Sequence, residues 1–107
     1  MNDRHFANFH IAGFTYYYGV DVFENLKIGT PLSLKAEPEN PYDPDAVAIY
    51  YQGLQIGYVP KAENELIHKF LNLGYTDLFE IKISQINPEA YPEKQVRVVV
   101  RIKEHAF

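Results

Sequence analysis

Apolar and polar residues alternate along several short stretches of this chain, and a period of two is the pattern of a strand that buries one face. The alternation is clear in residues 31–36, 78–86 and 95–103. In each stretch, valine, isoleucine, leucine or phenylalanine stands at every second position, with mostly polar residues between. The sequence therefore predicts three half-buried strands there.

The aromatic-rich stretch from Phe6 to Tyr18 predicts a long first strand. We expect it to bend at Gly13, because a glycine inside a strand pattern is typical of a bulge. A loop over residues 19–29 follows. Its apolar residues are expected to point inward: Phe23, Leu26 and Ile28.

A hairpin is predicted in the middle of the chain, where residues 46–51 and 54–59 flank Gln52-Gly53. Before it, residues 37–44 contain three prolines, which remove backbone donors and keep the preceding residues extended. We expect this segment to be an exposed, irregular loop.

Residues 61–73 form the one stretch with helical periodicity, and Gly74 follows where glycine commonly ends helices. Apolar residues recur there at helical spacing: Ala62, Leu66, Ile67, Phe70, Leu71 and Leu73. Short strands with a single helix after the central hairpin predict a mainly β (α+β) fold. We expect a small antiparallel barrel, or a strongly coiled sheet, of about six strands. Residues 1–107 are expected to form one domain.

The chain of 107 residues has a net charge of −4, from ten Lys and Arg against fourteen Asp and Glu. Such a protein does not bind nucleic acid through bulk positive charge, so any binding must come from a local patch. The absence of cysteine excludes disulfides and thiolate metal sites. Neither a membrane span nor a secretory signal is visible, so we expect a cytoplasmic protein with no membrane partner.

No catalytic set can be proposed from the sequence. The glycines form neither a phosphate-binding loop nor a dinucleotide fingerprint, and both serines lie in predicted strands. The histidines lack the spacing of a helix-borne metal site, and we expect His68 to be solvated. The acids of residues 37–45 lack the ligand spacing of a calcium loop, so a solvated acidic loop explains them better. We expect a binding module with no cofactor, no metal and no enzymatic activity.

Aromatic content is the unusual feature of the composition, with nine Tyr and seven Phe. In a strand, the run that follows Phe14 would place Tyr16 and Tyr18 on one face and Tyr17 on the other. These rings either pack the core with their hydroxyls at its rim or form an exposed platform on which bases stack. The sequence leaves both interpretations open.

Two groups of cations are candidates for binding anions. Lys61 stands where the helix begins, beside N–H groups that favour anions, although an ordinary surface lysine explains it equally well. Arg97, Arg101 and Lys103 share one face of the last strand. The solvated face of a half-buried edge strand explains this basic stripe more simply.

Three segments of the chain, residues 11–19, 29–47 and 56–60, resemble the HIRAN domain family. The specific part is Glu-Pro-Glu-Asn-Pro-Tyr-Asp-Pro-Asp-Ala-Val at 37–47, followed by Ile-Gly-Tyr-Val-Pro at 56–60. In size the chain is similar to the short stand-alone members found in bacteria. The resemblance implies an OB-like β-barrel that captures the 3′ end of single-stranded DNA.

The resemblance also implies a set of nucleic-acid-binding positions: Tyr16, Tyr17, Tyr42, Asp43, Tyr58 and Lys61. Tyr16 and Tyr42 would stack on bases, and Asp43 would accept a hydrogen bond from the free 3′-hydroxyl. The other two tyrosines would line the pocket, and Lys61 would meet a phosphate.

The sequence departs from the DNA-binding members at two positions. Thr15 stands where they have an arginine, and Tyr58 stands where they tend to have a histidine. Without that arginine, affinity for DNA is expected to be weak and steeply salt-dependent. A structural role explains the loop without any ligand: Asn40 caps its turn, Tyr42 seals the barrel mouth and Asp43 bonds backbone amides.

Two functions therefore stay open. The first is a DNA-repair module that binds single-stranded DNA at its 3′ end, with a helicase or nuclease as a partner protein. The second is a protein-interaction or accessory domain that keeps the barrel and has lost DNA binding, which Thr15 and the net charge of −4 favour. An open, positive groove near Tyr16, Tyr42 and Lys61 would indicate DNA, and an acidic or filled one the alternative.

Overall fold

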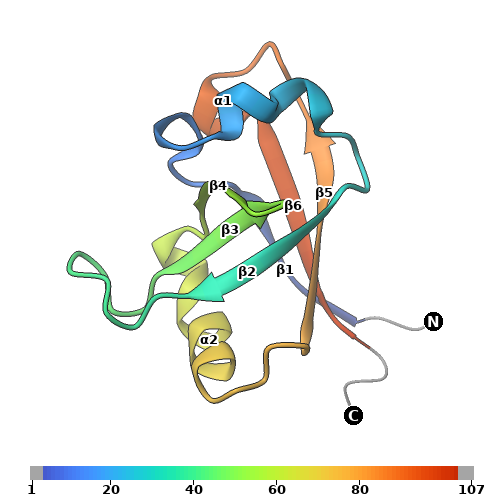
Figure 1. Cartoon of the computed structure of the whole chain (residues 1–107). Coiled ribbons are helices and arrows are strands. Elements are labelled where there is room, and N and C mark those ends of the chain that lie inside the picture. Colours follow the sequence, from blue (N-terminus) through green and yellow to red (C-terminus); the bar gives the residue numbers. More distant parts are fainter. Residues whose placement is uncertain (1–3, 104–107) are drawn as a thin grey trace.

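The computed structural model describes residues 4–103, which fold into six strands with one long helix packed beside them (Figure 1). The strands are β1 (Arg4–His10), β2 (Pro31–Ala36), β3 (Val47–Tyr51), β4 (Leu54–Tyr58), β5 (Phe79–Ile86) and β6 (Val96–Ile102). The helices are α1 (Gly19–Val22) and α2 (Lys61–Asn72), with 3₁₀ turns η1 (Phe14–Tyr16), η2 (Phe23–Asn25) and η3 (Pro92–Lys94). The mainly β class and the helix after the central hairpin are confirmed.

All six strands belong to one antiparallel sheet in the order β1-β6-β5-β2-β3-β4. Strands β1 and β4 lie at its two ends, and the chain just beyond β1 curls back to β4. There Ala12 and Tyr58 exchange two backbone hydrogen bonds of 2.9 Å. One bridge is not a ladder, so the sheet is coiled but not closed. Of the two forms predicted for the six strands, the barrel is therefore wrong and the coiled sheet is the one observed.

Local sequence signals placed the central hairpin and helix α2 correctly. Gln52 and Gly53 have φ values of 47° and 85°, as expected for the tight turn that matches strand twist in a hairpin. Helix α2 begins at Lys61, directly after Pro60, and ends before Gly74, which has a φ of 103°. The strands over residues 31–36, 78–86 and 95–103 are also confirmed to within one residue at either end.

The first strand is much shorter than predicted. It ends at His10, and Gly13 adopts a left-handed conformation (φ 68°) from which the η1 turn begins. This turn directs Phe14 into the core, where the side chain is 1% exposed. Because residues 14–16 are not a strand, the tyrosines that follow Phe14 do not alternate between two faces as predicted. The short helix α1 follows at Gly19, inside the segment 19–29 that was predicted as a loop with a short turn.

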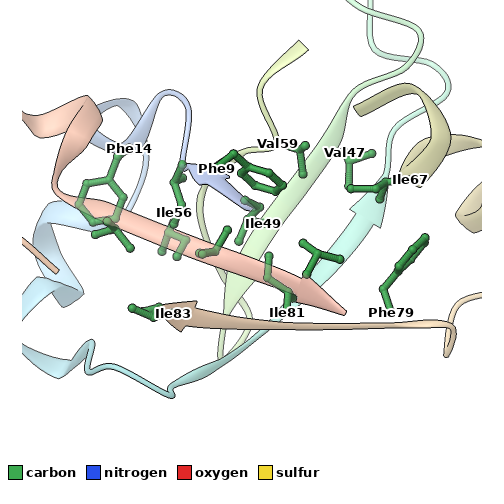
Figure 2. Packing of buried hydrophobic residues seen from close by; sticks show 14 of the residues in the cluster. Phe9, Phe14, Val47, Ile49, Ile56, Val59, Ile67, Phe79, Ile81 and Ile83 are labelled. Carbon is green, nitrogen blue, oxygen red and sulfur yellow. The ribbon is translucent and has the colours of Figure 1, made fainter. Parts of the chain in front are cut away.

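The core lies in the concavity of the coiled sheet, and α2 covers one end of it (Figures 1 and 2). Figure 2 labels ten residues of this core, which come from β1, β3, β4, β5 and α2 and from the segments after β1 and β4: Phe9, Phe14, Val47, Ile49, Ile56, Val59, Ile67, Phe79, Ile81 and Ile83. Burying each such side chain contributes about 1.5–3 kcal/mol. Ile28, predicted to point inward, is 70% exposed, whereas Leu26 is buried as expected.

Two predictions about exposed faces are also wrong. Strand β6 lies between β1 and β5 and is an interior strand, not an edge. In and just after α2, three residues of the predicted apolar stripe are exposed: Ala62, Leu66 and Leu73. The buried face consists of Asn64, Ile67, His68 and Leu71. No helix within residues 4–103 has the length and apolar character needed to cross a membrane.

Candidate nucleic-acid interface

A groove of about 470 Å³ lies where the chain after β1 meets the proline-rich loop and the start of α2. One wall, the aromatic wall, is the segment 12–17, which lines the groove with Ala12, Gly13, Tyr16 and Tyr17. The second wall, the loop wall, is the segment 40–46, which lines it with Asn40, Pro41, Tyr42, Asp43 and Ala46. Tyr58 and Val59, at the end of β4, lie between the two, and Lys61 stands at the start of α2.

Gly57 allows the aromatic wall to approach β4. A Cβ atom at this position would lie 2.5 Å from the carbonyl oxygen of Ala12 and 2.4 Å from Cγ2 of Ile11. Both distances are far inside van der Waals contact, and the first involves rigid backbone. The glycine of the Ile-Gly-Tyr-Val-Pro segment is therefore required for the bridge between Ala12 and Tyr58, on which the groove is built.

Asn40 holds the turn of the loop wall. Its Oδ1 atom accepts hydrogen bonds from the backbone N–H groups of Tyr42 (2.8 Å) and Asp43 (3.0 Å). This is the cap predicted from the sequence, since an asparagine side chain readily accepts from the backbone two or three residues ahead. The turn fixes the direction in which the next two side chains leave the loop.

Asp43 is a fixed, ionised acceptor. Its Oδ1 accepts from the backbone N–H of Asp45 and its Oδ2 accepts from Nδ2 of Asn64, both at 2.9 Å. The N–H of Asp45 is the largest influence that holds the pKa of this carboxyl below its ordinary value of 3.8, and the Asn64 amide adds to it. The nearby charge of Lys61 acts in the same direction. The carboxylate is therefore negative at neutral pH.

Two buried polar residues of α2 secure the loop wall, and neither was predicted from the sequence. Asn64 is 4% exposed and binds Asp43, while His68 is 6% exposed with Nδ1 3.1 Å from the carbonyl oxygen of Ala46. The expectation of a solvated His68 is wrong, because the loop covers this helix face. A signal was present: Asn64, Ile67, His68 and Leu71 have the i, i+3, i+4, i+7 spacing of one helix face.

Tyr58 forms part of the groove floor. Its hydroxyl donates a 2.7 Å hydrogen bond to Oε1 of Glu37, which also accepts from Nδ2 of Asn40 at 3.0 Å. Burial first, and then the bond to Glu37, raise the pKa of the Tyr58 phenol to about 12. The Glu37 carboxylate is thus held by two donors of the protein.

The aromatic residues of the two walls differ in how much ring they leave in water. Tyr16 is 84% exposed and Tyr42 is 89% exposed, so Tyr42 does not seal the mouth as predicted. Tyr17 is 38% exposed and packs edge-on against Tyr58, with ring centroids 5.6 Å apart and planes at 70°. Tyr18 is exposed but does not line the groove.

Comparison with known proteins decides the family. The model of the HIRAN domain matches residues 5–103, nearly the whole chain. The chain belongs to the HIRAN family. A search of curated proteins gives no match.

Two solved structures share the HIRAN fold of this chain. A crystal structure of a protein from Lactobacillus plantarum aligns with a TM-score of 0.78 at 15% identity, covering 94% of this chain and 96% of that one. The crystal structure of the HIRAN domain of human HLTF aligns with a TM-score of 0.63 at 19% identity, covering 98% of this chain and 84% of that one. At these identities the likeness shows the fold alone.

The six positions that the HIRAN resemblance assigned to nucleic acid all line this one groove: Tyr16, Tyr17, Tyr42, Asp43, Tyr58 and Lys61. Their role in binding stays a prediction. Tyr16 and Tyr17 reach the groove together because η1 is a turn, and not through the alternating faces of a strand. The groove is open, but among residues 4–103 Lys61 is its single lining cation and Asp43 its single lining acid. Among residues 4–103, no group of three histidine or acidic side chains is placed to hold a metal ion.

Proposed function

We propose that this HIRAN domain captures the 3′ end of single-stranded DNA in the groove between its aromatic wall and its loop wall. The observation that carries the proposal is the pair of exposed rings, Tyr16 and Tyr42, on the two walls of a groove that also holds an ionised acceptor and a cation. A helicase or nuclease would be the partner protein that acts on the captured strand in DNA repair.

The exposed rings supply the binding energy. A tyrosine ring that is more than four-fifths exposed contributes little to folding and has most of its face available to a base. Stacking of a base on an aromatic side chain contributes about 1–3 kcal/mol and tolerates any base. Because the rings of Tyr16 and Tyr42 stand on different walls, each would stack a different nucleotide.

Asp43 supplies selectivity for the strand end. Each of its oxygens accepts one hydrogen bond from the protein, and a carboxylate has acceptor sites for about four. The remaining sites accept a hydrogen bond from a free hydroxyl. A terminal phosphate has no such donor at neutral pH and carries a charge that the carboxylate repels.

Lys61 is the one cation of the described part of the chain that lines the groove, and it would contact a phosphate. With Thr15 where DNA-binding members of the family have arginine, the groove neutralises few phosphates. Affinity for short strands is therefore modest. It falls as salt rises, because the release of counterions from the strand contributes less free energy at higher salt.

Fluorescence anisotropy with labelled single-stranded oligonucleotides at low salt tests the proposal. We expect binding of an oligonucleotide with a free 3′-hydroxyl and at least about tenfold weaker binding when that end carries a phosphate. Asp43→Asn removes this discrimination, and Tyr16→Ala weakens binding of both forms. Tyr18→Ala is the matched control, because Tyr18 is an exposed neighbour outside the groove.

Equal affinity for both ends would overturn 3′-end capture, and no binding of either would overturn the DNA proposal. The second result would favour a protein-interaction or accessory domain. The net charge of −4 and the single lining cation are the observations that support this alternative.

A further inference from the structure

Cationic and aromatic residues stand close together in the chain where the η3 turn meets the His10–Arg97 pair of β1 and β6. We call this group the basic corner and define it as His10, Tyr91, Lys94 and Arg97. The η3 turn, which begins after Tyr91, packs against η1, which carries Tyr16 of the groove. In Figure 1 the orange-red segment before β6 lies next to the blue segment after β1. The basic corner thus adjoins the aromatic wall.

Arg97 is positioned by β1. It pairs with His10 in the register of β1 and β6, and its side chain points away from the core because Val96 and Val98 are the buried residues of this stretch. Its guanidinium donates to Oδ1 of Asn8, and its Nη1 lies 3.4 Å from Nδ1 of His10. These contacts leave other donors of the guanidinium free, since arginine has five.

Within residues 4–103, no carboxylate pairs with the cations of the corner. The ion pairs of this part of the chain are Lys82–Glu80 and Lys103–Asp77, so neither Lys94 nor Arg97 has a carboxylate of these residues within 4.0 Å. Lys94 ends the η3 turn three residues before Arg97, which faces His10 across β1 and β6. Burial, then the charge of Arg97, then that of Lys94 lower the pKa of His10. Glu93 shares the η3 turn but forms no ion pair with either of them.

Tyr91 adds an exposed ring to these cations. It is 77% exposed, and η3 fixes its backbone through a 2.8 Å hydrogen bond from the N–H of Lys94 to its carbonyl oxygen. An exposed ring on the same short segment as a cation without an ion pair is a combination by which proteins hold single strands, with bases on the ring and phosphates on the cations.

We propose that the basic corner is a second nucleic-acid contact, which holds the strand on the 5′ side of the captured end. Phosphates lie against Lys94 and Arg97, and a base stacks on Tyr91. The inference rests on the proposed function, because a strand whose 3′ end lies in the groove must leave it toward its own 5′ side. The corner supplies the phosphate contacts that the groove lacks. It also explains how a protein of net charge −4 can bind a polyanion through a local patch.

The test compares a trinucleotide with a dodecanucleotide, both with a free 3′-hydroxyl. At about 50 mM salt we expect the longer strand to bind wild-type protein at least about tenfold more tightly, because it reaches two further phosphate contacts. The double variant Lys94→Gln/Arg97→Gln loses this gain and binds the trinucleotide normally. The slope of log affinity against log salt for the dodecanucleotide falls by about 1.4, or about 0.7 for each phosphate contact on single strands.

Two further variants keep the test decisive. Lys27→Gln/Lys35→Gln removes the same charge from exposed positions elsewhere and retains the length dependence. Lys94→Gln alone, at an exposed side chain, removes about half of the change in slope even if substitution of Arg97 impairs folding.

The possible failures are distinguishable. Equal affinity for both lengths, with the 3′-hydroxyl still required, would overturn the basic corner and leave the proposed function standing. The same would follow if the control pair reproduced the double variant. If a polyglutamate peptide displaced the dodecanucleotide as well as unlabelled DNA did, the assignment to nucleic acid would be wrong. No binding at either length would overturn the proposed function together with this inference.

Discussion

The two walls of the groove are held in place by different kinds of interaction. The aromatic wall is anchored by one apolar side chain, Phe14, which lies 1% exposed in the core and packs edge-on against Phe23 with ring centroids 6.1 Å apart. The loop wall has no comparable anchor between residues 40 and 45. Polar side chains hold it instead: Asn40 within the loop, and Asn64 and His68 from α2.

Because of this difference, we expect substitutions in the two walls to affect the stability of the fold to different degrees. An apolar anchor is worth several kcal/mol and is insensitive to pH, whereas a hydrogen bond to a charged group is worth less and depends on the protonation state. The aromatic wall is therefore expected to fail with the whole fold. The loop wall is expected to respond to small chemical changes while the fold remains.

The largest expected effect comes from removing the apolar anchor. Phe14→Ala is expected to lower the free energy of unfolding by about 3–5 kcal/mol, because it leaves a cavity under the aromatic wall. Urea denaturation followed by circular dichroism measures the change. Val20→Ala, at a 60% exposed position a few residues away, is the control and is expected to change little. A decrease below about 1 kcal/mol for Phe14→Ala would contradict the proposed anchoring.

The next largest effect concerns the loop wall. Asn64→Leu keeps the size of the side chain but removes the donor to Asp43, and we expect a decrease in stability of about 1–3 kcal/mol at neutral pH. The folded-state pKa of Asp43 lies below its ordinary value of 3.8, so its contribution is present above that value and is lost as pH falls through the folded-state pKa.

The difference between wild type and Asn64→Leu should therefore shrink at acid pH. Urea denaturation over a series of acid pH values measures it, with Glu65→Gln on the exposed side of α2 as the control. A difference that is the same at every pH would show that Asn64 acts through packing alone.

A smaller effect is expected at the groove floor. Tyr58→Phe removes the hydrogen bond to Glu37 and is expected to lower the free energy of unfolding by about 1 kcal/mol. Because the folded-state pKa of Tyr58 is raised from 10.0 to about 12, this contribution is full below 10.0 and is lost as pH rises toward about 12. An ultraviolet titration of the tyrosines measures this pKa. The account would be contradicted if wild-type protein showed no phenol that ionises near pH 12, or if Tyr58→Phe still showed one.

The smallest effect on stability is expected from the exposed rings. Tyr16→Ala and Tyr42→Ala should each change the free energy of unfolding by no more than about 0.5 kcal/mol, since both rings lie largely in water. Affinity for single-stranded DNA should fall by about 1–3 kcal/mol for each ring removed. Anisotropy and denaturation on the same samples give both values. A large decrease in stability would indicate a structural role for the rings.

Local chemistry made part of this fold predictable. The hairpin follows from Gln52-Gly53, which permits the positive φ values of the turn, and α2 lies between Pro60 and Gly74. The end of β1 could not be predicted, because it depends on the bridge between Ala12 and Tyr58, far apart in the chain. Whether the sheet closes also depends on these distant segments, because they pair through a single bridge and not through a ladder.

The candidate site was predictable only in part. The family motif supplied the six groove positions, and the Asn40 cap followed from local turn chemistry. The burial of Asn64 and His68 could not be inferred from their polarity. It depends on where the loop lies, and the loop is placed by the hydrogen bonds that these two residues make. Polar residues at core spacing on a helix are therefore worth testing as supports for a neighbouring loop.

Among the residues that the structure describes, the two ends of the sheet meet only at the bridge between Ala12 and Tyr58, which we call the seam, where a barrel would have a continuous ladder of hydrogen bonds. Parting the two ends there breaks one pair of backbone hydrogen bonds and not a ladder, so local opening costs less free energy at the seam than along the paired strands. Amide hydrogen exchange at these two residues measures that opening. A molecule that contacts both Tyr16 of the aromatic wall and Asp43 of the loop wall would connect the two walls across this bridge. Slowed exchange at two backbone amides would then report occupancy of the groove without any label on the ligand.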